Sequence, residues 1–190
     1  MPLLNPDGAD IVAGRIRHPR FLSEKSRWQA NYRGVDLNHN YDAGFHLAKE
    51  MVEREGIKGP HYTKYGGEAP FSEPETKAIR DLCEKIPFDL AVALHSQGEE
   101  IYYEYDGMIP EGTNEYLKSF QKHSHYRIAI PLGTASHGGM KDWFIKTYQK
   151  PAFTIEAGLG KNPLPHALFP KIYQDCSALL HSAFETLRKL

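Results

Sequence analysis

Two residues with the chemistry of a hydrolase, His95 and Glu156, each close a short apolar run of the sequence. The run that begins at Phe88 ends abruptly at His95, and the run from Ala152 to Ile155 ends at Glu156. The length of the first run, bounded by Pro87 and Gly98, predicts a strand buried on both faces of a sheet, and the second run is predicted to be a strand as well. Ligands of open α/β sheets bind at the carboxyl ends of strands. If the two strands are close, one rim of the sheet carries a metal ligand and a general base.

For either residue alone, the alternative is a solvated or hydrogen-bonded side chain at a strand end, with no chemical role. Residue type and strand position do not separate these interpretations. The hypothesis therefore depends on whether His95 and Glu156 open into a common hollow, within reach of one water molecule.

Composition narrows the class of protein. The chain has 190 residues, 41% of them hydrophobic, which suffices for one substantial core, so we expect a single domain over residues 1–190. The net charge of -1 gives no reason to expect nucleic acid or an acidic membrane as partner.

No apolar run approaches membrane-spanning length, and the first residues lack the pattern of a secretory signal, so we expect a cytoplasmic protein. Cys83 and Cys176 fall at apolar positions of predicted helices and are expected to be buried thiols.

The elements that must position these residues alternate along the chain. Helices are predicted over Phe45–Glu55, Ser72–Ile86, Thr113–His125, Met140–Tyr148 and Ile172–Leu187, and strands over 88–95, 100–105, 126–131 and 152–155. Ser72 and Glu75 have the spacing of a capping box at the start of their helix. Strands alternating with helices predict a layered α/β fold.

The first part of the chain shows no such alternation. Leu3-Leu4 looks like the end of a strand, and Asn5-Pro6-Asp7-Gly8 carries a strong turn signal. From Ala9 to Arg33 the sequence has no clean period, so we expect an irregular surface segment there.

Five short motifs, taken in order, resemble those of the zinc carboxypeptidase family. They are Asn5-Pro6-Asp7-Gly8, Gly34-Val35-Asp36-Leu37-Asn38, Ala93-Leu94-His95-Ser96, Gly139-Met140-Lys141-Asp142-Trp143 and Phe153-Thr154-Ile155-Glu156. Finer matches, such as His95-Ser96-Gln97-Gly98-Glu99, are similar to the branch with the γ-D-glutamyl-diaminopimelate endopeptidases, which cut the stem peptides of peptidoglycan. The resemblance covers nearly the whole chain. It implies a mixed β-sheet flanked by helices, a zinc cofactor and a peptide substrate, for which the branch suggests a cell-wall muropeptide.

The resemblance also assigns roles to the two residues at the strand ends. His95 matches the third zinc ligand of the family. Glu156 matches the carboxylate that takes a proton from the attacking water and passes it to the leaving amine. Both roles agree with the chemistry argued from the strand ends, because neutral imidazole suits zinc and a half-buried carboxyl has a raised pKa.

The family's first two zinc ligands come from an H-x-x-E motif that lies upstream of the segment matched by Asn5-Pro6-Asp7-Gly8. The candidate pairs in this chain, His46 with Glu50, His95 with Glu99 and His181 with Glu185, are one residue too widely spaced. We therefore expect a domain truncated at its N-terminus: a fragment, a chain completed by a second one, or an inactive remnant or peptide-binding module. An uncovered sheet edge would favour a homo-oligomer or a preceding segment that covers it.

Four further positions match residues with which the family binds its substrate. Asn38 is retained, but His39 replaces the arginine that pairs with the terminal carboxylate, so endopeptidase-like specificity is more natural. Gln29 aligns with the oxyanion-stabilising arginine, for which Arg27 or Arg33 could substitute, and Thr134 aligns with a mobile tyrosine. The alternative is that His39, Gln29 and Thr134 are ordinary loop residues.

Two other histidines, His123 and His125, are two residues apart near the end of a predicted helix. Because this spacing does not place them on one helical face, we expect surface residues rather than metal ligands.

Overall fold

The structure is a computed structural model that describes residues 3–18 and 27–190. The chain divides into two compact units, each built from two stretches of sequence. Unit 1 comprises Met1–Pro87 with Leu132–Trp143, and unit 2 comprises Phe88–Pro131 with Phe144–Leu190. A single domain over residues 1–190 stays a prediction, and each unit is described by itself below.

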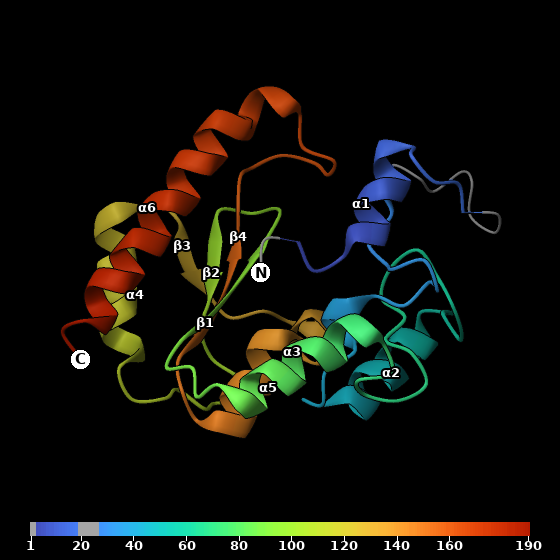
Figure 1. The fold of residues 1–190 in the computed structure, drawn as a ribbon, viewed down its shortest axis with the longest axis horizontal. Coiled ribbons are helices and arrows are strands. Elements are labelled where there is room, and N and C mark those ends of the chain that lie inside the picture. The colour runs from blue at the N-terminus through green and yellow to red at the C-terminus, as the bar shows by residue number, and fades with distance from the viewer. Residues whose placement is uncertain (1–2, 19–26) are drawn as a thin grey trace. The chain divides into compact units, whose positions relative to one another are not determined.

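Unit 2 contains a mixed sheet of four short strands (Figure 1). The strands are β1 (Ala91–His95), β2 (Glu100–Tyr102), β3 (Arg127–Ala129) and β4 (Ala152–Glu156), and their order across the sheet is β1-β4-β2-β3. β1 runs parallel to β4 and β2 runs parallel to β3, whereas β2 and β4 are antiparallel. This arrangement confirms the α/β fold with a mixed sheet and flanking helices.

Two helices of unit 2, α4 (Thr113–His123) and α6 (Phe169–Leu187), lie side by side and cover one face of this sheet (Figure 1). Ile101, Phe153 and Ile155 are fully buried in the core that the sheet shares with these helices. The helices contribute Tyr116, Leu117, Phe120, Cys176, Leu179 and Ala183. Since successive strand residues point to opposite faces, the residues between these apolar positions face the other side of the sheet.

The expectation that the strand ending in His95 is buried on both faces is wrong. In β4 the first four residues are buried, but no residue of β1 is, and Leu94 is 50% exposed. The reason is topological: β4 lies between β1 and β2, whereas β1 ends the sheet among the described residues. An apolar run alone does not distinguish a central strand from an edge strand.

Unit 1 holds the helices α1 (Pro6–Ala13), α2 (Phe45–Arg54) and α3 (Pro74–Lys85), and the short 3-10 helices η2 (Leu37–His39) and η3 (Gly133–Ser136). Helix α5 (Met140–Tyr148) begins in unit 1 and continues into unit 2, where η4 (His166–Leu168) precedes α6. The helices predicted from Phe45 and from Met140 are confirmed.

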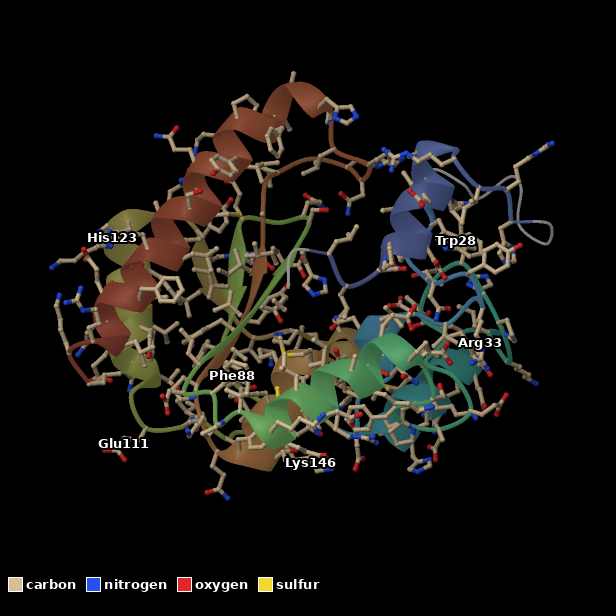
Figure 2. All side chains as sticks on the ribbon, viewed as in Figure 1. Trp28, Arg33, Phe88, Glu111, His123 and Lys146 are labelled. Carbon is tan, nitrogen blue, oxygen red and sulfur yellow. The ribbon has the colours of Figure 1, made fainter. Side chains whose placement is uncertain are left out.

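The turn predicted at residues 5–8 is wrong, because this segment begins α1. The side chain of Asn5 caps the helix by accepting a hydrogen bond from the backbone N–H of Gly8 at 2.9 Å, and Pro6 occupies the first turn. Asn before Pro is a signal for a turn and equally for a helix start. Ile11 of α1 packs against Trp28, labelled in Figure 2, so the segment from Ala9 is not wholly irregular. Residues 19–26 of that segment lie outside the described residues.

A buried polar network fixes the start of α3. The cap is Glu73, which is 0% exposed and accepts hydrogen bonds from Asn31 at 2.7 Å and Ser72 at 2.9 Å. Asn40 contributes its side-chain oxygen, which accepts from the Thr76 hydroxyl at 2.6 Å. The predicted capping box of Ser72 and Glu75 is therefore wrong: no side chain caps the helix, and Ser72 bonds to Glu73 instead.

The remaining expectations concern thiols and membranes. Cys176 is buried in α6, whereas Cys83 in α3 is only partly buried. Across the helices of the described ranges, none has the length and apolar character needed to cross a bilayer.

Candidate functional site

His95 and Glu156 are direct neighbours at the ends of two parallel strands. β1 and β4 pair in a register that sets His95 opposite Glu156. The backbone N–H of Ala157 donates to the carbonyl of His95 at 2.8 Å, which closes the strand pair at this end. Side chains of directly paired residues project from the same face of a sheet. The imidazole and the carboxyl group therefore share one face, opposite the face that α4 and α6 cover.

The loops that follow the two strands are tied to each other. The backbone N–H groups of Gly98 and Glu99 donate to the carbonyl of Gly158 at 2.8 and 3.2 Å. The Asn162 side chain donates to the Ser96 carbonyl at 2.8 Å. Gly158 has φ +75, and a Cβ atom there would lie 2.7 Å from Ile172. A side chain at this position would clash with Ile172 of α6 and with Leu164, which explains the glycine shortly after the Glu156 strand.

The row of His95 and Glu156 continues across the sheet with two residues that the sequence did not single out. Glu100 of β2 pairs with Glu156 on one side and with Arg127 of β3 on the other. Glu100 accepts hydrogen bonds from the Tyr102 hydroxyl at 2.6 Å and from Arg127. The face thus carries, in order, an imidazole, two carboxyl groups and a guanidinium. The only sequence signal for Glu100 was its place at the start of a predicted strand.

The two carboxyl groups of this row differ in acidity. Burial, and then the charge of Glu100, raise the pKa of Glu156 to about 7. The hydrogen bond from Tyr102, followed by that from Arg127, lowers the pKa of Glu100. Glu100 is therefore the ionised partner near neutral pH. Glu156 is left poised between its protonated and ionised forms, as a proton-transfer group must be.

The first two substrate-binding candidates, Asn38 and His39, lie in unit 1 on η2. The Asn38 side-chain oxygen accepts from the backbone N–H of Met140 at 3.4 Å, so Asn38 is held against the start of α5. His39 is partly buried, and among the described residues its Nδ1 atom has no hydrogen-bond partner. A Cβ atom on Gly138 would lie 3.2 Å from the His39 backbone, so this loop can approach so closely only with glycine.

The other candidates of unit 1 lie on its loops. Gln29 is exposed and accepts a hydrogen bond from the Thr63 hydroxyl, and Thr134 is partly buried in η3. Two arginines were expected as substitutes for the family's oxyanion-stabilising arginine. The Nε atom of Arg33 lies 3.7 Å from a carboxylate oxygen of Glu73, and the guanidinium of Arg27 lies over the Tyr62 ring. The structure thus groups His95 with Glu156 in unit 2, and places Asn38, His39, Gln29 and Thr134 in unit 1. The roles of all six stay predictions.

Zinc fits this arrangement only in part. A catalytic zinc site takes three protein ligands and keeps one position open. Within residues 3–18 and 27–190, one cluster of three candidate ligands occurs, made of Glu99, His125 and Asp175, and it does not include His95. His95 suits zinc as a single imidazole ligand, but the described residues do not complete a site around it.

Comparison with known proteins identifies what the chain is similar to. The family described as zinc carboxypeptidase matches residues 1–178. The chain is 36% identical to the γ-D-glutamyl-L-diamino acid endopeptidase 1 of Lysinibacillus sphaericus over 187 residues, covering 92% of this chain and 46% of that protein. It is 27% identical to the carboxypeptidase B of Bos taurus over 172 residues, covering 82% of this chain and 39% of that protein. The chain therefore spans about half the length of these relatives or less.

A solved structure supports the same fold. The carboxypeptidase A of Helicoverpa armigera superposes with a TM-score of 0.64 at 18% identity, covering 96% of this chain and 50% of that chain. The mixed sheet and its helices are therefore those of a carboxypeptidase-like α/β fold.

Proposed function

This chain belongs to the zinc carboxypeptidase family, and on that premise we propose that it serves the zinc-dependent hydrolysis of peptide bonds in bacterial cell-wall peptides. One observation carries the proposal: His95 and Glu156 are paired on adjacent parallel strands and share one face of the sheet. The similarity to a γ-D-glutamyl-L-diamino acid endopeptidase supports the choice of substrate class.

In this proposal Glu156 moves the proton. A carboxyl group with a pKa of about 7 can accept a proton from an attacking water and return it to the leaving amine near neutral pH. Glu100 keeps a negative charge beside it, which favours the protonated form after the first transfer. His95 offers a neutral imidazole as one zinc ligand, and bound zinc supplies Lewis-acid polarisation.

The other zinc ligands come, in this proposal, from parts of the protein beyond the described residues or from a second chain. The described residues place no second ligand set around His95. The relatives are about twice as long as this chain, which leaves room for such residues.

Substrate selection is assigned to the residues of unit 1. We propose that Asn38, His39, Gln29 and Thr134 contact the peptide. A histidine at position 39 offers at most one charged hydrogen bond, whereas an arginine offers a bidentate pair to a terminal carboxylate. This favours cleavage within a modified peptide over removal of a terminal residue.

The test is hydrolysis of a γ-D-glutamyl-diaminopimelate peptide by the zinc-supplied protein, compared with its α-linked isomer. We expect cleavage of the γ-linked peptide. Glu156→Gln should lower kcat by about 10²- to 10⁴-fold with the zinc content unchanged. His95→Ala should lower the zinc content itself. The matched control is Glu111→Gln, because Glu111 is exposed and stands away from the row (Figure 2). Full activity of Glu156→Gln would refute the proposal.

The incomplete ligand set favours one rival function, a peptide-binding module without catalysis. Zinc content separates the two. The enzyme binds one tight equivalent that is lost in His95→Ala, whereas the binding module retains the wall peptide but has no zinc that depends on His95.

We further propose that the free side of β1 is covered by a second copy or by another segment of the protein. Among the described residues β1 pairs only with β4, and Leu94 on it is half exposed. Exposed strand edges recruit further strands. A strictly monomeric chain in light scattering at high concentration would exclude self-association.

A further inference from the structure

A second group of metal-binding side chains lies in unit 2, apart from the row of His95 and Glu156. Glu99 precedes β2, His125 precedes β3, and Asp175 lies on α6. One donor atom from each lies within 4.8 Å of the other two, and His125 Nε2 is 3.0 Å from a Glu99 carboxylate oxygen. Three segments distant in sequence thus converge on one small volume. His125, expected from its spacing to be a surface residue rather than a ligand, lies beyond the end of α4 and belongs to this group.

This cluster is distinct from the proposed catalytic pair. Asp175 is next to Cys176, which belongs to the core that α6 forms with the sheet. That core covers the face of Ile101 and Ile155, whereas His95 and Glu156 project from the other face. Neither His95 nor Glu156 is part of the cluster.

The backbone around the cluster is held in place. Glu99 has φ +52, a conformation that residues other than glycine adopt at a cost. Hydrogen bonds stabilise it: the Glu99 N–H donates to Gly158, and the Glu99 carbonyl accepts from the Arg127 N–H at 2.8 Å. Tyr126, next to His125, accepts from the Gly158 N–H at 3.2 Å through its hydroxyl. These bonds fix the two loop residues of the cluster relative to each other.

The charge of the cluster is suited to a cation. Of the two carboxylates, Asp175 accepts hydrogen bonds from Lys171 at both of its oxygens, and Glu99 is paired with His125. The cluster therefore keeps a net negative charge when His125 is neutral. The same excess acts on Tyr126, whose pKa is raised by burial first and then by the charges of Asp175 and Glu99 among others.

Accessibility differs among the three side chains in a way that suits ion binding. Asp175 is 12% exposed, Glu99 25% and His125 52%. The two carboxylates are the more buried members of the cluster, and His125 is the most exposed. Water can fill the remaining coordination positions of an ion.

We propose that Glu99, His125 and Asp175 bind a divalent transition-metal ion, with Zn²⁺ the probe of choice. Imidazole and carboxylate are ligands that Zn²⁺ accepts, whereas Ca²⁺ and Mg²⁺ take oxygen ligands. Bonds of ~2.1 Å would draw the three donor atoms to ~3.4 Å from one another, a contraction that side-chain rotation supplies. Asp175 gives up one of its two bonds to Lys171. The bound ion ties α6 to the segments that precede β2 and β3.

The test is a zinc titration in a His95→Ala background, so that the proposed catalytic site does not contribute. We expect one equivalent of Zn²⁺ by calorimetry. A rise in Tm of about 3–6 °C should follow at ten times Kd, reversed by a chelator. Ca²⁺ at the same concentration should leave Tm unchanged.

Two variants locate the site. His125→Gln and Asp175→Asn, each in the same background, should remove the calorimetric signal and the rise in Tm. The matched control is His123→Gln, because His123 is exposed on α4 (Figure 2), where its ring nitrogen bonds to the Ser119 carbonyl instead of to the cluster. A zinc response that survives His125→Gln, or no response in the His95→Ala chain, would overturn the proposal. Since His95 is absent throughout, either result leaves the proposed peptidase function to its own test.

Discussion

Glu73 and Glu156 are both withdrawn from water, and their surroundings are opposite. Glu73 in unit 1 is fully buried and accepts hydrogen bonds from Asn31 and Ser72. Glu156 in unit 2 is partly buried, faces the like charge of Glu100, and receives no side-chain hydrogen bond from the described residues. The first carboxyl group is satisfied by its neighbours, and the second is kept away from groups that would satisfy it.

In the proposed function, this difference separates a structural carboxylate, Glu73, from a reactive one, Glu156. Hydrogen-bond donors around a buried carboxyl group satisfy its oxygen atoms and stabilise the fold. Burial without donors, next to a second carboxylate, costs stability and moves the pKa toward neutrality. A fold tolerates that cost where the group has a chemical task. Substitutions at Glu73, at Glu156 and around them test this difference.

The largest effect on the free energy of unfolding is expected for a substitution at Glu73. Glu73→Ala would leave the side chains of Asn31 and Ser72 without their buried acceptor, so we expect the free energy of unfolding to fall by about 3 kcal/mol. Urea denaturation measures it. Glu84→Gln is the control, since Glu84 forms only an exposed pair with Arg80 in the same helix. Equal, small effects at both positions would remove the contrast on which the comparison depends.

At Glu156 the expected effect is smaller and depends on pH. The folded-state pKa of about 7 lies above the ordinary value of 4.5, so the folded chain holds the proton more tightly than the unfolded one. The stabilisation is fully present below pH 4.5 and is lost as the pH rises toward 7. Because the group is partly exposed, we expect a loss of about 2 kcal/mol in metal-free protein.

Glu156→Gln should abolish this loss. The difference in unfolding free energy between wild type and variant should therefore change between pH 5 and pH 7 and be constant above pH 8. A difference that does not vary with pH would show that Glu156 titrates as an ordinary surface carboxyl group.

The next prediction concerns Glu100, whose negative charge opposes the ionisation of Glu156. Glu100→Gln removes a negative charge from the same row, so the pKa of Glu156 should fall. The fall should be less than half of the shift from 4.5 to about 7, because burial is the larger cause. Carboxyl-carbon NMR titration reads it directly. An unchanged midpoint would mean that burial alone sets the pKa.

The smallest effect is expected at Arg127, which is the exposed end of the row. Arg127→Gln removes a hydrogen bond to Glu100 and should raise the pKa of Glu100, with Tyr102 still donating. The same NMR titration follows Glu100. If the pKa of Glu100 does not change in the variant, the hydrogen bond from Tyr102 alone accounts for the lowered pKa of Glu100.

Much of unit 2 could be predicted from sequence, because local pattern and tertiary role coincide there. The apolar runs ending in His95 and Glu156 are strands, and the helical spacing around Leu179 gives α6 its buried side. The pairing of the two strands could not follow from either run, since it depends on contacts between distant segments. The α/β fold class followed from the alternation of predicted strands and helices, and the resemblance carried by the motifs implied the mixed sheet.

The features that the sequence analysis predicted wrongly or did not identify have physical causes. The start of α1 was taken for a turn, because Asn5 and Pro6 suit both. The cap of α3 was placed one residue early, because Ser72 has a local capping pattern that the buried network around Glu73 overrides. Glu100 was missed since its importance arises only from the strand beside it.

The most direct test of the account is the titration midpoint of the Glu156 carboxyl group in the metal-free chain, followed by NMR of the labelled side chain. Burial beside Glu100 predicts a midpoint near pH 7. A midpoint near 4.5, the ordinary value for glutamate, would contradict the claim that this position is built for proton transfer next to His95.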